Sequence, residues 1–321
     1  MLDVVPLGTG SALPTATRHL SATAVRRDGR VVLFDCGEGT VRRLMQAHLG
    51  GDRLDAVCIT HLHGDHVYGL PGLVTTLGLL GRTRPLTLVG PAALRGVLDA
   101  MPGLAADGAP FPIVHVGLEA GFEHAVVYDD GHVRIEARPI EHRVFCAGYR
   151  LTEHDRPGSI DGDAARAAGV AHGEHFEALK RGETVTLDDG TAVTPDGLVG
   201  PPKPGASVAY VLDTRPCAGG VALARGADLL VHEATFGDAY AARAAEVGHS
   251  TAREAAGVAR EAGARRLLIT HFSARYGSVQ TLVDEAREVF PETDEAVELA
   301  TYTAGSPRAA TPPADTPPAR A

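Results

Sequence analysis

Short hydrophobic runs and stretches of helical periodicity alternate along this chain of 321 residues. Runs that are rich in β-branched residues and have the length of strands predict strands at residues 4–7, 21–25, 31–34, 56–60, 86–89, 125–128, 133–139, 207–213, 228–233 and 266–270. Apolar residues at helical spacing predict helices from about residue 41 and at residues 67–80, 92–101, 250–262 and 282–289. This alternation indicates an α/β core in which helices cover the faces of sheets.

A segment from about residue 152 to residue 205 departs from this pattern. It is rich in Gly, Pro, Asp and Glu, and it holds only a short helical stretch, residues 175–181, and a hairpin-like stretch, residues 183–193. We therefore predict an arm inserted into a single domain of residues 1–303. The remaining residues, 304–321, are rich in Pro, Ala and Thr and lack core-forming side chains, so we expect them to be disordered.

The sequence His-Leu-His-Gly-Asp-His at residues 61–66 concentrates side chains of metal-ligand type between a predicted strand and a predicted helix. Gly64 can adopt the backbone conformations of a tight turn there. Imidazole and carboxylate groups together suit zinc or a similar transition metal. The alternative is a polar surface turn that happens to be rich in histidine. We favour the metal site, because a lone histidine is usually structural whereas such a dense group is not.

Further side chains of ligand type follow other predicted strands. They are His142, Asp213, His232, Glu233 and His271. Each alone would more often be a surface or structural residue, but the active sites of α/β folds gather at strand ends. Their joint occurrence therefore extends the metal-site hypothesis beyond residues 61–66.

Two other features each have two interpretations. Asp35, at the end of a predicted strand, either orients a ligand histidine or caps the following helix. The glycine-containing loop of residues 8–14 is either a flexible turn or a loop that approaches a phosphate. It matches neither a Walker loop nor a complete dinucleotide-binding motif.

The net charge and the cysteine spacing bear on which partners and which cellular compartment the protein can have. The formal net charge of -10 argues against general electrostatic adhesion to nucleic acid or to an anionic membrane. Bound metal ions could still create a local cationic site. The four cysteines form no CxxC pair, which favours a reducing cytoplasm over a disulfide framework. Because neither a signal peptide nor a membrane-spanning run is visible, we expect a cytoplasmic location and no membrane partner.

Several motifs, taken together, resemble the ribonuclease Z branch of the metallo-β-lactamase superfamily, whose members are tRNA 3′-processing endonucleases. Residues 61–66 carry the superfamily signature. The branch is indicated by residues 34–40 (FDCGEGT), His142 with residues 148–150 (GYR), and residues 212–214 (LDT), 232–235 (HEAT), 248–251 (GHST) and 271–276 (HFSARY). The resemblance spans about residue 4 to residue 290.

This resemblance implies a four-layer αβ/βα sandwich that holds two zinc ions per subunit, with manganese as another candidate ion. Transferred to this chain, one ion takes His61, His63 and His142, the other takes Asp65, His66 and His271, and Asp213 bridges both. A pair of metal ions can stabilise both the attacking and the leaving oxygen of a phosphodiester cleavage. His232 is then left with a structural role.

For the reaction, we expect a hydroxide between the two ions to attack the phosphorus while Asp65 accepts its proton. His249, held by Glu233, would protonate the leaving 3′ oxygen. The products would be a tRNA with a 3′-hydroxyl and a trailer with a 5′-phosphate. The alternative for His249 is a structural position at the start of a helix, beside Ser250 as the cap.

The resemblance also implies that the inserted arm grips the elbow of precursor tRNA, commonly from the partner subunit of a homodimer. Substrate-binding residues are therefore expected at Lys180 and Arg181 in the arm and at Arg18 and Arg275 in the core. For Lys180 and Arg181 the alternative is a solvated surface pair, which is the more usual role of such pairs.

The chain departs from the family pattern in two places. The loop of residues 14–19 keeps Pro14 and Arg18 of the family's Pro-x-Lys-x-Arg-Asn loop, which bears on where cleavage falls relative to the CCA end. The arm has Gly173-Glu174 where the family usually has a Gly-Pro step. These departures concern tRNA binding and the cleavage position and leave the metal ligands intact.

The sequence therefore predicts a zinc-dependent endoribonuclease that removes the 3′ trailer from precursor tRNA. The rival enzyme is a dinuclear metallo-hydrolase of the same superfamily that acts on a small phosphodiester, sulfate ester or lactone. A nucleic-acid-binding protein with a vestigial site is disfavoured by the intact ligand set. A structural zinc protein is disfavoured because structural zinc sites are usually closed, four-coordinate and rich in cysteine.

Overall fold

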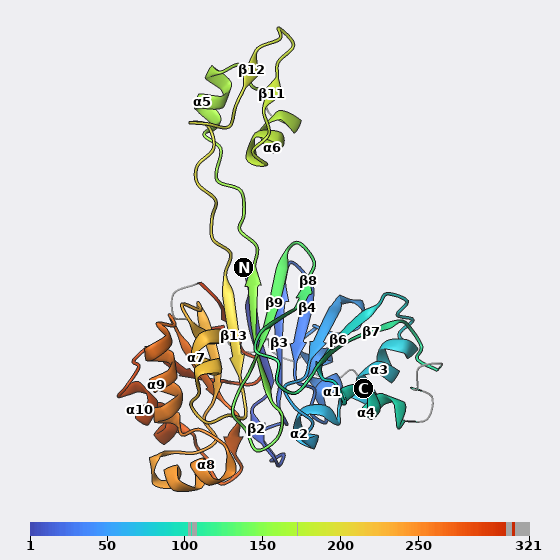
Figure 1. Ribbon diagram of the computed structural model, residues 1–321, viewed down its shortest axis with the longest axis vertical. Helices are drawn as coiled ribbons and strands as arrows, with labels where there is room; N and C mark the ends of the chain where they lie inside the picture. Colours follow the sequence, from blue (N-terminus) through green and yellow to red (C-terminus); the bar gives the residue numbers. More distant parts are fainter. Residues whose placement is uncertain (102–103, 105–107, 172, 306–309, 312–321) are drawn as a thin grey trace, which may run out of the picture. The chain divides into compact units, whose positions relative to one another are not determined.

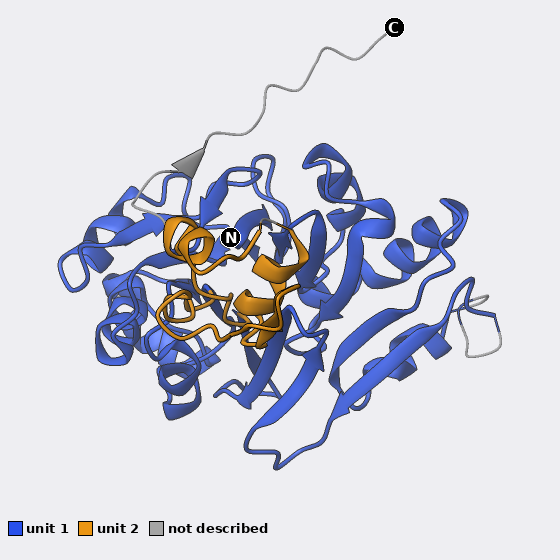
Figure 2. Cartoon of the chain, turned by 90° about the horizontal axis from the view of Figure 1, so that it is seen from above, with its two compact units in different colours: residues 1–152, 206–321 blue, residues 153–205 orange. Residues whose placement is uncertain are grey.

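The computed structural model describes residues 1–101, 104, 108–171, 173–305 and 310–311, and Figure 1 shows the order of their helices and strands. The chain divides into two compact units, one of Met1–Thr152 with Ala206–Ala321 and one of Glu153–Gly205 (Figure 2). The smaller unit occupies the part of the sequence where an inserted arm is predicted. No helix in the described part of the chain combines the length and the apolar character that a membrane crossing requires.

The first sheet of the larger unit has eight strands in the order β19-β18-β1-β3-β4-β5-β6-β7. Their bounds are β1 Asp3–Gly8, β3 Ala22–Arg27, β4 Arg30–Phe34, β5 Leu54–Cys58, β6 Leu86–Pro91, β7 Ile113–Leu118, β18 Thr301–Thr303 and β19 Ala310–Thr311. The hairpin between β3 and β4 is tight because Asp28 and Gly29 both take positive φ, 45° and 80°. From β4 to β7 the strands run parallel, and every residue of β5 is buried.

The second sheet has seven strands in the order β17-β15-β14-β13-β10-β9-β8. Their bounds are β8 Ala125–Asp129, β9 Val133–Pro139, β10 Ala147–Glu153, β13 Ser207–Val211, β14 Leu229–Glu233, β15 Leu267–Thr270 and β17 Thr293–Glu295. Because β13, β14 and β15 are parallel neighbours, their carboxyl ends meet at one edge of the sheet. Asp213, Glu233 and His271 lie at these three ends.

Helices cover the outer faces of both sheets. The helices of this unit, including α2 and α8, which lie outside those covering layers, are α1 Thr40–Gln46, α2 Gly64–Val67, α3 Leu70–Leu79, α4 Leu94–Asp99, α7 Ala218–Ala224, α8 Ala241–Val247, α9 Ala252–Ala262 and α10 Gln280–Arg287. Two short turns, η1 (Gly51–Arg53) and η2 (Asp238–Tyr240), and the paired two-residue strands β2 (Gly10–Ser11) and β16 (Phe272–Ser273) complete the unit.

Buried hydrophobic clusters separate the layers. One fills the space between the two sheets and contains the rings of Phe34, Tyr149 and Tyr210. A second packs α7, α9 and α10 against the outer face of the second sheet, and a third packs α1, α3 and α4 against the outer face of the first (Figure 1). This arrangement confirms the predicted four-layer αβ/βα sandwich.

The helix predicted at residues 67–80 is confirmed over Leu70–Leu79 as α3, but the chain turns at residues 68–69 and the short α2, Gly64–Val67, precedes that turn. The prediction is wrong here because the chain at Gly69 approaches a distant segment. A Cβ on Gly69 would lie only 2.1 Å from the carbonyl oxygen of Gly37. Pro71 then lies in the first turn of α3, where its missing N–H is no loss. Helices α7 and α8 were not predicted, since they consist largely of alanine and glycine and offer little apolar periodicity.

The smaller unit, Glu153–Gly205, has a hydrophobic cluster of its own, formed by Ala165, Val170, Phe176, Leu179, Val185 and Val193. Its helix α5 (Gly162–Ala167) is capped by Asp161, whose carboxylate accepts the N–H groups of Asp163 and Ala164. Helix α6 (Glu174–Lys180) follows, and β11 (Val185–Thr186) pairs with β12 (Ala192–Val193) in a hairpin. The segment is therefore a small folded unit with a core.

The disorder predicted for residues 304–321 mostly concerns residues outside the described part of the chain. Ala304 donates its N–H to the carbonyl of Leu2 at 2.8 Å. Ala310–Thr311 pair with β18 as β19, contrary to the predicted disorder.

Candidate metal centre

Side chains from well-separated segments meet at the carboxyl ends of the strands. The loop after β5 supplies His61 and His63, α2 supplies Asp65 and His66, and the segments after β9, β13 and β15 supply His142, Asp213 and His271. Asp213 and His271 both adopt positive φ, 54° and 60°. Such backbone strain in non-glycine residues persists where the surrounding structure enforces it, often at functional sites.

The first group consists of His61, His63, His142 and Asp213, and one ligand atom from each lies within 4.8 Å of the others. His61 Nε2 is 2.8 Å from His63 Nδ1 and 3.7 Å from Asp213 Oδ2. His142 Nδ1 donates to the carbonyl of Gly248 at 2.8 Å, which fixes its tautomer and leaves Nε2 as the ligand atom.

The second group consists of Asp65, His66 and His271, again with ligand atoms within 4.8 Å. His66 Nε2 lies 3.4 Å from Asp65 Oδ2 and 3.3 Å from His271 Nε2. Asp213 Oδ1 lies 3.3 Å from His66 Nε2 and 3.2 Å from His271 Nε2. Because its other oxygen faces His61, the Asp213 carboxylate lies between the two groups.

A set of hydrogen bonds orients the ligand side chains. Asp35 accepts from His66 Nδ1 at 2.8 Å, from Thr60 N–H at 2.8 Å and from the Tyr210 hydroxyl at 3.1 Å. Asp35 therefore orients His66, a candidate ligand, and does not cap α1, whose N-cap is Gly39. Sequence reasoning missed Tyr210, because a buried tyrosine on a strand gives no signal of its distant partner.

The loop of residues 8–14 is part of this set and is not a free turn. Its β2 pairs with β16, and Ala12 donates its N–H to Asp65 Oδ2 at 2.8 Å. Thr235 was also missed. Its hydroxyl lies 2.9 Å from His271 Nδ1, so it fixes that ring as Asp35 fixes His66.

The electrostatics of the site suit a cation. Burial lowers the pKa of His61, His63 and His142, which favours the neutral imidazoles that metals bind. Burial alone would raise the pKa of Asp213, but the charges of His271 and His66 outweigh it and keep this carboxylate ionised. Burial would also lower the pKa of His66, yet Asp213 and Asp35 raise it well above its ordinary value. These two carboxylates therefore stabilise positive charge at His66.

Two buried ligand atoms, His142 Nε2 and Asp213 Oδ1, have no hydrogen-bond partner among the described residues. Buried polar atoms are rarely left unsatisfied, so two such atoms among the candidate ligand groups fit a site that binds a cation. Nitrogen and carboxylate oxygen donors at these distances fit zinc or a similar divalent ion. His232 Nε2 is also unpaired, but His232 belongs to neither ligand group, and its Nδ1 donates to the carbonyl of Glu233.

His249 lies beside the second group and is held by Glu233. Its Nδ1 is 2.9 Å from Glu233 Oε1, and the Glu233 carboxylate also accepts the N–H of Thr214 at 2.6 Å. Burial opposes protonation of His249, but the Glu233 carboxylate outweighs it and raises the His249 pKa to about 9. The helix cap is Thr251, which forms a capping box with Glu254. The expectation that Ser250 is the cap was wrong, because its hydroxyl donates to the carbonyl of Thr214.

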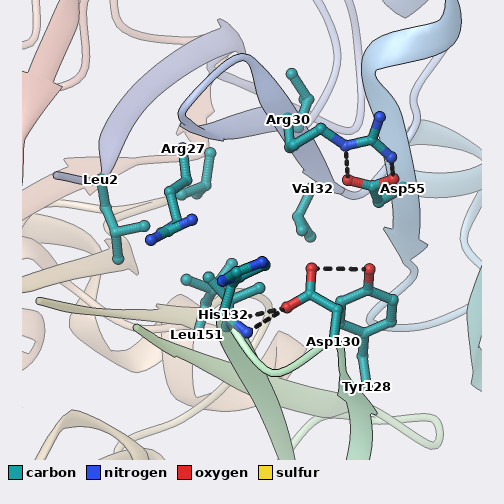
Figure 3. A pocket seen from close by; sticks show the side chains of 12 residues that line it. Leu2, Arg27, Arg30, Val32, Asp55, Tyr128, Asp130, His132 and Leu151 are labelled. Atoms are coloured by element: carbon teal, nitrogen blue, oxygen red, sulfur yellow. Dashed lines mark hydrogen bonds and ion pairs between the residues drawn. The ribbon is translucent and has the colours of Figure 1, made fainter. Parts of the chain in front are cut away.

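A cavity of about 540 Å³ opens onto this centre. It is lined by Ser11, Ala12, Pro14, Leu20, Glu38, His63, Gly64, Asp65, Tyr68, Arg143, Asp213 and His249. Another cavity, shown in Figure 3, lies elsewhere, among residues such as Leu2, Arg27, Tyr128 and His132, and its volume is about 40 Å³. That volume suits at most a few water molecules, so it is no substrate site.

The residues predicted to bind substrate are engaged in other contacts. Arg18 donates to the carbonyl of Tyr276 at 2.8 Å, and Arg275 lies over the Tyr240 ring at 4.3 Å. Neither of these arginines lines the 540 Å³ cavity. In the smaller unit, Lys180 pairs with Glu177 and Arg181 pairs with Glu183, both at 2.8 Å and both exposed to solvent. Such exposed pairs contribute little to stability and can open for a ligand.

The fold and this paired centre define a hydrolase of the metallo-β-lactamase superfamily, and residues 18–141 match the profile of that superfamily. The chain is 53% identical to ribonuclease Z of Salinibacter ruber over 302 residues, 94% of either chain. It is 39% identical to ribonuclease BN of Escherichia coli over 307 residues, 94% of this chain and 99% of that one. The chain belongs to the ribonuclease Z family, whose enzymes are metal-dependent endoribonucleases.

Solved structures agree with this assignment. The crystal structure of the short form of human tRNase Z (ELAC1) aligns with a TM-score of 0.68 at 29% identity, over 95% of this chain and 100% of that one. The metallo-β-lactamase fold protein YhfI from Bacillus subtilis aligns with a TM-score of 0.64 at 19% identity, which shows the shared fold.

Proposed function

We propose that this chain is a zinc-dependent endoribonuclease that removes the 3′ trailer from precursor tRNA and leaves a 3′-hydroxyl tRNA and a 5′-phosphate trailer. The observation that carries the proposal is the placement of the Asp213 carboxylate between two ligand groups, with His249 on the same cavity. The relatives named ribonuclease Z and tRNase Z support tRNA as the substrate.

Two divalent cations would be held by the two groups, with Asp213 shared between them. His61, His63 and His142 would complete one site, and Asp65, His66 and His271 the other. When bound, such ions stabilise developing charge on phosphodiester oxygens and lower the pKa of water to about 7. The nitrogen-rich donors favour zinc, and manganese is the alternative.

Two side chains of the cavity would accept and donate the protons of the reaction. Asp65 is ionised, because hydrogen bonds to His271 and His66 outweigh burial and hold its pKa well below the usual range. With Oδ2 fixed by the Ala12 N–H, Asp65 can accept the proton of the attacking water. His249 donates its Nδ1–H to Glu233. The Nε2–H of the protonated ring is therefore left to protonate the leaving 3′ oxygen. The oxygen of the water forms a bond to phosphorus and becomes part of the 5′-phosphate of the trailer. The bond from phosphorus to the 3′ oxygen breaks, and this oxygen takes the proton of His249 and becomes the 3′-hydroxyl of the tRNA.

We assign tRNA gripping to the smaller unit, Glu153–Gly205. The absence of the family's Gly-Pro step does not prevent helix formation, since α6 begins at Glu174 after Gly173. Gly173 takes φ 120°, which glycine readily adopts, and Glu174 places negative charge at the helix start. The homodimer and the cytoplasmic location stay predictions from the sequence.

The test is incubation of a precursor tRNA carrying a 3′ trailer with the wild-type protein and with Asp65→Ala, with both product ends mapped. We expect cleavage by the wild type alone, which leaves a 3′-hydroxyl on the tRNA and a 5′-phosphate on the trailer. Elemental analysis of the wild type should find about two zinc ions per chain. Mapping also locates the cut relative to CCA. Hydrolysis of bis(p-nitrophenyl) phosphate without trailer removal would instead favour the rival small-substrate hydrolase.

A further inference from the structure

The cavity at the metal centre has one cationic side chain that is not a histidine. Glu38, Asp65 and Asp213 supply the acids of its lining, and Arg143 supplies the guanidinium. Arg143 is exposed and makes no side-chain hydrogen bond or ion pair with any residue in the described part of the chain. It therefore differs from Arg18 and Arg275, whose guanidinium groups are already engaged.

Arg143 lies beside the segment that carries His249, the proposed proton donor. A Cβ on Gly248 would lie 3.2 Å from Arg143 Cγ and 3.0 Å from His142 Nδ1, so the arginine stem packs against this glycine. The next residue is His249.

Tyr68 lines the same cavity and lies next to Asp65. A Cβ on Gly64 would be 2.4 Å from Tyr68 Cε2, so the ring lies against the glycine that precedes Asp65. The side chain is 69% exposed and belongs to none of the hydrophobic clusters of the described residues. An exposed ring at a cavity that takes RNA offers a face on which a base can stack.

Attack and departure lie on opposite sides of the phosphorus in an in-line displacement. Under the function proposed above, Asp65 serves the attacking side and His249 the leaving side. Arg143 packs beside Gly248, which precedes His249, and Tyr68 packs beside Gly64, which precedes Asp65, so the two side chains lie on the leaving side and the attacking side of the cavity.

We propose that Arg143 and Tyr68 form an RNA-binding subsite that sets the direction of the strand across the cavity. Arg143 binds the phosphate on the 5′ side of the last tRNA nucleotide, the one whose 3′ oxygen leaves. Tyr68 stacks on the base of the first trailer nucleotide. The inference rests on the proposed endoribonuclease function.

The test uses the zinc-loaded full chain and single-turnover cleavage of precursor tRNA. Arg143→Ala should lower kcat/KM about tenfold to a hundredfold, as expected for one lost contact between a guanidinium and a phosphate. Tyr68→Ala should lower it about tenfold, as expected for one lost stacking contact. Arg143→Lys should retain part of the activity, and Arg260→Ala, an exposed α9 arginine outside the cavity lining, should change nothing.

Modified substrates then assign the positions. A methylphosphonate in place of the phosphate before the last tRNA nucleotide should abolish the effect of Arg143→Ala and leave that of Tyr68→Ala. An abasic first trailer nucleotide should abolish the effect of Tyr68→Ala and leave that of Arg143→Ala. Hydrolysis of bis(p-nitrophenyl) phosphate, which has no second phosphate, should fall less in Arg143→Ala than cleavage of precursor tRNA does.

Three outcomes would overturn the subsite. In the first, the methylphosphonate abolishes the effect of Tyr68→Ala and the abasic nucleotide abolishes that of Arg143→Ala. In the second, both variants lose as much activity on the modified RNAs as on the unmodified one. In the third, Arg143→Ala loses equal activity on precursor tRNA and on bis(p-nitrophenyl) phosphate. Each of these leaves trailer removal by the wild type intact. Failure of the wild type to cut any precursor tRNA would instead remove the proposed function, and the subsite with it. Thermal midpoints of the variants identify any loss of folding.

Discussion

Glu233 and His249 form a hydrogen-bonded pair in which Oε1 lies 2.9 Å from Nδ1, and the Glu233 side chain is fully buried. Removing one partner leaves the other without its charge complement inside the protein. The pair therefore ties His249, the proposed proton donor on the cavity, to a fully buried carboxylate.

His249→Ala should lower the rate of trailer removal by about 10²–10⁴-fold, the usual contribution of a general acid. Metal binding should stay, because the two proposed sites take their ligands from the other two groups, although His249 also has a ligand atom within 4.8 Å of Asp213 and His271. Single-turnover cleavage with elemental analysis measures both. A His249→Ala enzyme with two metal ions and full nuclease activity would remove the proposed role.

Glu233→Gln should shift the pH dependence of cleavage. The carboxylate raises the pKa of His249 to about 9 in the metal-free chain, against burial, which lowers it. Bound cations repel the imidazolium, so in the loaded enzyme we expect the alkaline decline of kcat/KM below about pH 9. Loss of the Glu233 charge should move this decline to lower pH, as measured by kcat/KM profiles of wild type and variant. Coincident profiles would contradict the pairing.

The same pair predicts a pH-dependent stability of the metal-free protein. A folded-state pKa raised above the ordinary histidine value means that the stabilisation is complete below about pH 6.5 and is lost as the pH rises towards about 9. The free energy of unfolding in chelator should therefore differ between wild type and Glu233→Gln more at pH 6 than at pH 9.5. A difference that does not depend on pH would show that the pair contributes packing alone.

Asp35→Asn should weaken zinc binding by about 10–100-fold, the usual cost of losing a carboxylate that orients a ligand histidine. Asp35 accepts from His66 Nδ1 at 2.8 Å and is fully buried. Competition with a chromogenic chelator measures the affinity. Asp99→Asn, which alters an exposed ion pair on α4, is the matched control. Equal affinities of the two variants would refute the role of Asp35.

Shortening the arm should separate RNA cleavage from the chemistry of the centre. Arg156 and Lys203 exchange backbone hydrogen bonds of 2.9 and 2.8 Å, so an Asn-Gly turn can join them in place of residues 157–202. We expect unchanged hydrolysis of bis(p-nitrophenyl) phosphate. Cleavage of precursor tRNA should fall about a hundredfold, the equivalent of two lost charged contacts of roughly 1.5 kcal/mol each. Equal losses on both substrates would argue against an RNA-binding arm.

The metal-ligand candidates could be predicted from the sequence because ligand chemistry is a property of side-chain type. Residues 61–66 carry their spacing locally, and His142, Asp213 and His271 each follow a run that predicts a strand. The layered α/β fold was also predictable, because strands and helices have different hydrophobic periods.

Contacts between distant segments were decided by the tertiary structure alone. Tyr210 reaches Asp35 across 175 positions of sequence, and Ala12 reaches Asp65 across 53. The break between α2 and α3 follows from the close approach of Gly69 to Gly37. Whether an arginine has a partner, as Arg18 has, or has none among the residues that the structure describes, as is the case for Arg143, depends on which strands and loops lie beside it. Local pattern carries side-chain chemistry and periodicity, but strand register and loop packing arise only when the whole chain has folded.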